Sequence, residues 1–233
     1  MRTRSHLART TLLMAGVLLL SAIFLIRRQS QDAPAVPCMA FNPDRVAHLE
    51  AGGWRAYYDR DWPRVLALMV QMNRTQFCMG WLDAVTGALD IVRAAAAFAP
   101  VDNDVPAATA HLERFYATAR RTANLHADAA TLAAREIDYW VVHRALAVAR
   151  KAAPGHAGDI EPMVGALERL HAAIFTAPPE SIRRSAEKRA LAAATVDRIT
   201  GGYSPDVSAD WAAIEQTLRA AYRAVAPASV TSH

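Results

Sequence analysis

Apolar and polar residues alternate with a helical period through most of this chain, from about residue 43 to residue 227. Apolar positions recur at spacings of three and four, whereas the strict alternation that predicts strands is nearly absent. Prolines, glycines and capping residues divide the periodic stretch into eight segments of helical length. The predicted helices span 43–60, 61–76, 79–98, 104–123, 129–152, 160–176, 178–201 and 209–226. The pattern therefore predicts an all-α fold, with about eight helices in a single domain.

Local signals place several of these helix ends. Small polar residues stand directly before apolar periodic runs, as N-cap residues do. The predicted N-caps are Asn42, Asp61, Asp104, Asp128, Asp159 and Ser208. The pair Gly52-Gly53 weakens the middle of the first helix, and a break there is expected.

A different pattern occupies residues 1–28. An uncharged run from Thr10 to Ile26 follows three arginines, and Arg27-Arg28 close it. As a helix this run is roughly 25 Å long, slightly short of a ~30 Å hydrocarbon core, but Arg9 can snorkel and so extend it. The pattern predicts one transmembrane helix. The alternative is a cleaved signal peptide, but a small-residue cleavage site is poorly developed, because the apolar run continues to Ile26.

The arginines also predict an orientation. Three precede the apolar run and two follow it, which favours a cytoplasmic N-terminus. Because the composition is rich in Ala and Arg and poor in Lys, as in many bacterial proteins, we expect a bacterial inner-membrane protein with a periplasmic helical domain. The predicted organisation is an anchor (1–28), a linker (29–42), the helical domain (43–227) and a C-terminal tail (228–233).

Charge changes the picture once the anchor is set apart. The formal net charge of the chain is +4, from 26 basic and 22 acidic residues. Five of the basic residues and none of the acidic ones lie in residues 1–28, so residues 29–233 carry a net charge of −1. A nearly neutral domain lacks the basic surface that nucleic-acid binding requires, so no nucleic-acid partner is expected. The basic run of the seventh helix, which includes Arg183 and Arg189, alternates with glutamates and predicts a solvated face.

Two cysteines, Cys38 and Cys78, are present. In an oxidising compartment such a pair predicts a disulfide, worth roughly 3–4 kcal/mol for a loop of about 40 residues. The alternative is that both are small buried apolar side chains.

Glu136 and His143 are weak candidates for an acid/base pair. Helical spacing puts them on one side of the fifth helix together with Trp140, beside apolar neighbours. Buried ionisable groups must be paired or change their pKa. The alternative to a catalytic site is a satisfied polar network that fixes the register of the helix.

Two weak metal candidates also occur. Glu168 and His171 form one Glu-x-x-His motif, but a di-iron bundle requires a second, which is absent. Asp102 and Asp104 resemble the start of a Ca²⁺ loop without its glycine and distant glutamate, and Asp104 is explained as a helix cap. No metal and no other cofactor is therefore predicted.

Four aromatic residues follow the predicted membrane helix closely, and they are Trp54, Tyr57, Tyr58 and Trp62. Trp and Tyr favour the membrane interface, so these residues are candidates for contact with the lipid bilayer or a membrane partner. The alternative is a core cluster with Phe77 and Trp81.

The sequence favours a membrane-anchored accessory or scaffold subunit, without catalytic activity of its own, that contacts a larger membrane protein complex. The alternative is a helical domain that binds a small ligand such as a lipid, quinone or pigment, or an enzyme built on Glu136 and His143.

Overall fold

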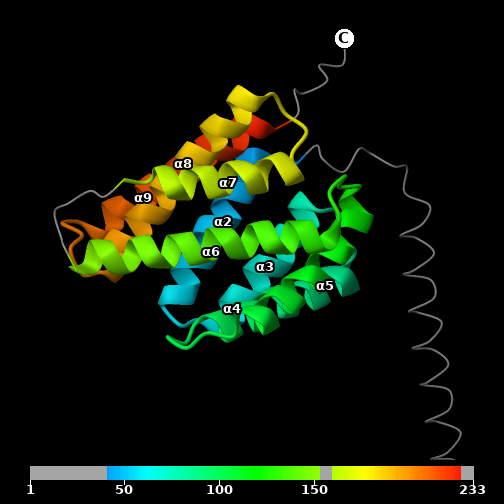
Figure 1. The fold of residues 1–233 in the computed structure, drawn as a ribbon, viewed down its shortest axis with the longest axis horizontal. Coiled ribbons are helices and arrows are strands. Elements are labelled where there is room, and N and C mark those ends of the chain that lie inside the picture. The colour runs from blue at the N-terminus through cyan, green and yellow to red at the C-terminus, as the bar shows by residue number, and fades with distance from the viewer. Residues whose placement is uncertain (1–40, 153–158, 227–233) are drawn as a thin grey trace, which may run out of the picture. The chain divides into compact units, whose positions relative to one another are not determined.

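The computed structural model describes residues 41–152 and 159–226 of the chain (Figure 1). The predicted anchor and the C-terminal tail lie outside the described residues. The described part contains eight α-helices and no strand, so the predicted all-helical fold is confirmed there. The helices are α2 (Pro43–Tyr58), α3 (Trp62–Gln76), α4 (Trp81–Phe98), α5 (Val105–Ala123), α6 (Ala129–Ala152), α7 (Glu161–Ile174), α8 (Pro179–Thr200) and α9 (Val207–Val225).

Side-chain caps start four of the eight described helices where the sequence predicts. Asn42, Asp61 and Asp104 each accept a hydrogen bond from the backbone N–H three residues further on. Asp128 does the same for Thr131 at 2.7 Å. Each cap satisfies one of the backbone donors that a helix N-terminus leaves without an intrahelical partner.

One predicted cap is wrong, and another lies one residue away from the cap position. Asp206, not Ser208, caps α9, because its carboxylate accepts from Ala209 N at 2.9 Å, and the helix therefore begins two residues earlier than expected. Ile160 occupies the cap position of α7, but the carboxylate of Asp159 still accepts from Glu161 N, the first backbone N–H of the helix, at 2.8 Å. Every other helix end lies within two residues of its predicted position.

Helix α2 continues through Gly52-Gly53, so the predicted break does not occur. A side chain at Gly52 would approach Leu68 of α3 to 3.3 Å, whereas one at Gly53 would meet no atom within 4 Å. Because α2 packs against both α3 and α9, tertiary contacts hold the helix together despite the low propensity of glycine.

The helix packing closes on itself. Each helix packs against the next along the chain, and α9 returns to pack against α2. In Figure 1, α7, α8 and α9 lie on one side of α6, and α4 and α5 lie on the other. Short loops between most neighbouring helices favour this sequential packing.

The buried apolar side chains form three clusters instead of one. The first lies among α3, α4, α5 and α6, around Leu112 and Phe115. The second lies among α2, α8 and α9, around Val46 and Ile214. The third lies among α6, α7 and α8, around Leu167. A closed ring of helices with its apolar side chains divided in this way leaves room for a space between the clusters.

Within the described ranges, no helix combines the length and the apolar character that crossing a membrane requires.

Candidate functional site

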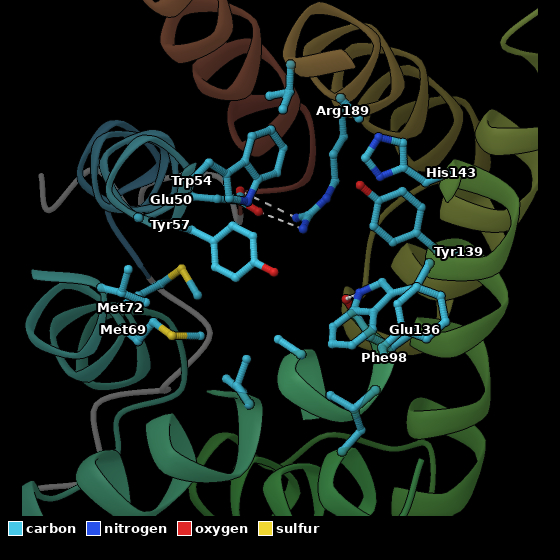
Figure 2. A pocket seen from close by; sticks show the side chains of 18 of the residues that line it. Glu50, Trp54, Tyr57, Met69, Met72, Phe98, Glu136, Tyr139, His143 and Arg189 are labelled. Atoms are coloured by element: carbon cyan, nitrogen blue, oxygen red, sulfur yellow. Dashed lines mark hydrogen bonds and ion pairs between the residues drawn. The ribbon is translucent and has the colours of Figure 1, made fainter. Parts of the chain in front are cut away.

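A cavity of about 590 Å³ lies among the helices, and all eight described helices contribute to its wall. Figure 2 shows Glu50, Trp54 and Tyr57 of α2 on one side and Glu136, Tyr139 and His143 of α6 opposite them. The volume falls within the ~300–1,000 Å³ that is usual for ligand sites. Protein cores normally contain few voids larger than a water molecule, so a space of this size is a feature of the fold to be explained.

One end of the cavity is open to solvent. The lining residues that are exposed cluster where α2, α4 and α8 end and where α3 begins, and they define the open end: Tyr58, Trp62, Ala96, Ala99 and Thr200. Arg144 lies beside this end, donates to Pro100 O at 2.9 Å and stacks 4.0 Å from the ring centre of Phe98. A cation at the last carbonyls of α4 satisfies groups that the helix leaves unpaired.

Most of the wall is apolar. Met69 and Met72 of α3 face the cavity from one side, and Phe98 faces it from the other (Figure 2). The unbranched, polarisable side chain of Met adapts to ligands of different shape. This wall suits an apolar or aromatic molecule.

A buried ion pair joins three helices at the cavity. Arg189 of α8 binds Glu50 of α2 with Nη2–Oε1 at 2.6 Å, and Tyr222 of α9 donates to Glu50 Oε2 at 2.7 Å. Burial opposes the charge on the guanidinium, but Glu50 and the neighbouring hydroxyls raise the pKa of Arg189 well above its usual value. Burial raises the pKa of Glu50, and the charge of Arg189 and the hydrogen bond from Tyr222 oppose that rise. Arg189 keeps its charge and is held between the rings of Trp54 and Tyr139, 5.9 Å from each.

Glu136 is held by two neutral donors. Trp140 Nε1 donates to Oε1 at 2.8 Å, and the Tyr116 hydroxyl donates to Oε2 at 2.9 Å. Burial and the Glu136 carboxylate raise the pKa of Tyr116, so the hydroxyl keeps its proton. The bond to Trp140 follows from the predicted helical spacing of four residues.

His143 has a different partner. Its Nε2 lies 2.9 Å from Oδ1 of Asp197 on α8, and Arg150 donates to the other carboxylate oxygen at 2.6 Å. The imidazole also stacks on Tyr139, with ring centres 5.7 Å apart. Glu136 and His143 line the same cavity but make no direct hydrogen bond, so the geometry matches the structural network more closely than an acid/base pair.

The residues of each candidate metal site have separate structural roles. Glu168 binds Arg183 at 3.3 Å, whereas His171 is buried against Phe175 and lines the cavity. Asp104 caps α5, and Asp102 is exposed in the loop before it. Among the described residues, no group of three or more potential His, Cys, Asp or Glu ligands could hold a metal ion.

The four predicted contact aromatics all line the cavity. Tyr57 packs edge-on against Tyr58 at 5.3 Å and Trp62 at 5.7 Å between ring centres. Of the two residues named in the alternative core cluster, Phe77 lines the same cavity and packs against Phe115, whereas Trp81 is exposed and stacks under Arg74. Contact with a bilayer or a partner stays a prediction. Of the four aromatic residues, Tyr58 and Trp62 are exposed and could make such a contact.

Cys78 lies in the loop between α3 and α4, with a left-handed backbone φ of 50°. Its proposed partner, Cys38, lies outside the described residues, so the predicted disulfide stays a prediction.

Sequence reasoning missed Glu50, Arg189 and Asp197. The predicted solvated face of α8 is wrong for Arg189, which lies on the helix side that carries Ile182, Ala186 and Ala193. These positions are three or four residues apart and therefore share one face of the helix. An arginine among apolar residues on one face was the sequence signal that could have predicted its burial.

Comparisons with known protein families, with curated proteins and with solved structures find no match.

Arg189→Met should destabilise the domain by about 3–5 kcal/mol, because it leaves the Glu50 carboxylate buried without its cation. The double variant Arg189→Met/Glu50→Leu should recover much of that loss. Urea denaturation of both single variants and the double variant measures the coupling. As a control, Arg223→Met breaks an exposed pair between Arg223 of α9 and Asp44 of α2 and should have a far smaller effect; an equal effect would contradict the importance of burial.

His171 should make stability depend on pH. Burial, and then the charge of Arg189, lowers the pKa of His171 from 6.5 to about 3, so the unfolded chain binds a proton between these values that the folded chain does not. Stability should therefore fall as the pH drops from 6.5 towards 3, by up to about 1.4 kcal/mol per pH unit from this group. His171→Gln should remove this part of the slope in urea denaturation between pH 6 and pH 4. The exposed His126→Gln is the control, and an unchanged slope in His171→Gln would refute the assignment.

Proposed function

We propose that the helical domain binds a small, mainly apolar molecule in its central cavity. The observation that carries the proposal is the cavity of about 590 Å³, walled by all eight described helices. Apolar and aromatic walls with a few convergent polar groups are typical of ligand sites. The open end beside Tyr58 and Trp62 supplies an entry path.

The polar groups in the cavity support binding more than catalysis. Glu136 is held by Tyr116 and Trp140, and His143 is held by Asp197. Both carboxylate oxygens of Glu136 are occupied, and among the described residues no hydroxyl or thiol forms a hydrogen bond with His143, so no nucleophile is paired with a base there. We therefore place the enzyme alternative second to simple binding.

Filling the cavity tests this function. Gly53 lines the cavity, and a Cβ atom added there meets no atom within 4 Å, so a leucine side chain can extend from this position into ligand space and Gly53→Leu should fold. We expect Gly53→Leu to weaken binding of the neutral dye Nile red at least tenfold, measured by fluorescence titration of the full chain.

Gly53→Ala is the matched control. It removes the same helical glycine and should stabilise α2 by about 0.5–1 kcal/mol, but its methyl group leaves most of the volume free, so dye affinity should change little. Absence of dye binding to the unmodified chain, or equal binding by Gly53→Leu, would contradict the proposal.

A second candidate is the accessory subunit. It rests on the predicted anchor and periplasmic location, and on adjacent apolar side chains that α4 presents to solvent, Trp81 at 59 % and Leu82 at 63 % exposure. Large exposed apolar groups that adjoin one another are typical of protein contact sites.

Purification from native membranes in mild detergent tests the accessory role. We expect a stoichiometric membrane protein to co-purify with the unmodified chain and to be lost from Trp81→Ser/Leu82→Ser, because these side chains would lie at the contact. The exposed Val148→Ser on α6 is the control. A lone monomer in the native preparation would remove the support for this role.

A further inference from the structure

Two deeply buried polar side chains line the cavity without a hydrogen-bond partner among the described residues. Tyr139 of α6 is 5 % exposed and His171 of α7 is 3 % exposed. No described residue forms a hydrogen bond with the Tyr139 hydroxyl, and Nδ1 of His171 is enclosed without a partner. Buried polar groups are normally hydrogen-bonded, so both side chains leave bonding capacity that something else can satisfy.

Arg189 brings these two groups into one region of the cavity. Its guanidinium carbon lies 5.9 Å from the ring centre of Tyr139, and its charge acts on His171 strongly enough to lower the pKa of that residue further. Figure 2 shows Arg189 reaching toward Glu50 past the Tyr139 ring. We call Tyr139, His171 and Arg189 the polar corner.

The polar corner offers hydrogen-bond donors. Burial raises the pKa of Tyr139, so its hydroxyl keeps a proton to donate. His171 is neutral at physiological pH and carries one N–H. Because an enclosed N–H without a partner is rarer than an enclosed acceptor, the proton belongs on Nε2, which leaves Nε2 to donate to a ligand.

Charge in the cavity selects a neutral ligand. The positive charge of Arg189 is already balanced by Glu50, and that of Arg150 by Asp197. Glu136 lines the same cavity and contacts no cation, since its partners are Tyr116 and Trp140. Arg144 also lines the cavity without a carboxylate partner, but it is held by backbone carbonyls at the open end and by the ring of Phe98. A ligand carboxylate at the polar corner would therefore add a buried negative charge beside a cation that Glu50 already balances.

We propose that the polar corner binds the carbonyl oxygen of a neutral, mainly apolar ligand, which accepts hydrogen bonds from Tyr139 and His171. The ligand body then lies along Met69, Met72 and Phe98, toward the open end of the cavity. This inference rests on the proposed binding function and names the chemical class of the ligand.

Three naphthalenes that differ in one substituent test the proposal. They are 2-acetylnaphthalene, with a neutral carbonyl, 2-ethylnaphthalene, with no acceptor, and 2-naphthoate, with a carboxylate. Titration calorimetry of the full chain measures each Kd, and the same buffer and detergent without protein serve as the blank. We expect the ketone to bind and the naphthoate to bind at least tenfold more weakly than the ketone.

Variants assign the carbonyl to the polar corner. Tyr139→Phe removes only the hydroxyl and should reduce the affinity for the ketone, relative to the ethyl compound, about fivefold, as expected for one lost hydrogen bond. His171→Gln keeps a side-chain N–H and should retain more of this preference than His171→Leu. Tyr203→Phe, outside the cavity wall, is the matched control and should leave the ratio unchanged.

The outcomes separate this inference from the binding function. One outcome is that the ketone and the ethyl compound both bind and Gly53→Leu weakens both. If the ratio of their affinities is then unchanged in Tyr139→Phe and His171→Leu, the proposal that the polar corner binds the carbonyl is overturned, and the proposed binding function stands. If the naphthoate binds more tightly than the ketone, the proposal that the ligand is neutral is overturned. If none of the three compounds binds but Nile red does, the carbonyl proposal is overturned and the binding function stands, whereas failure of Nile red as well overturns both proposals. Thermal unfolding of each variant verifies that it is folded.

Discussion

The contact between α2 and α9 is the constraint on which the site depends, because it closes the ring of helices. Glu50 and Tyr222 join these two helices inside the protein, and Arg189 of α8 binds both. On the surface, Asp44 and Arg223 form a second pair across the same contact. A chain of helices that pack only on their sequence neighbours would be open, whereas this closure turns their inner faces toward one space.

The same polar groups explain how a cavity of this size is compatible with a folded domain. Three apolar clusters supply the burial that stabilises the helices, and each lies between helices instead of at the centre. Each charged group that faces the cavity is held by an ion pair or by hydrogen bonds, so none is left without a polar partner beside the unfilled centre. Rigid pairs such as His143 with Asp197 also fix the positions of the rings that face a ligand.

Local signals in the sequence account for the helices but only for part of the site. Caps such as Asn42 and Asp104 act within three residues, and the face shared by Glu136 and Trp140 follows from one turn of helix. The partners of Glu50 lie 139 and 172 residues away, and no local pattern could pair them. The alternation of charges along α8 led to the wrong prediction that Arg189 is solvated. Its burial is explained only by its ion pair with Glu50 of α2, which the local sequence does not indicate. The break expected at Gly52-Gly53 failed for the related reason that packing on both sides outweighs glycine propensity.

Ring closure also imposes an order on biosynthesis. At about 5–20 residues per second, the 172 residues between Glu50 and Tyr222 take roughly 10–35 s to synthesise, and α2 waits that long for the helix against which it packs. Until then its apolar face, including Val46 and Leu49, lacks its final cover. A nascent chain of this kind has a prolonged need for protection from aggregation, and a ribosome that stops before α9 releases a protein without a closed binding chamber.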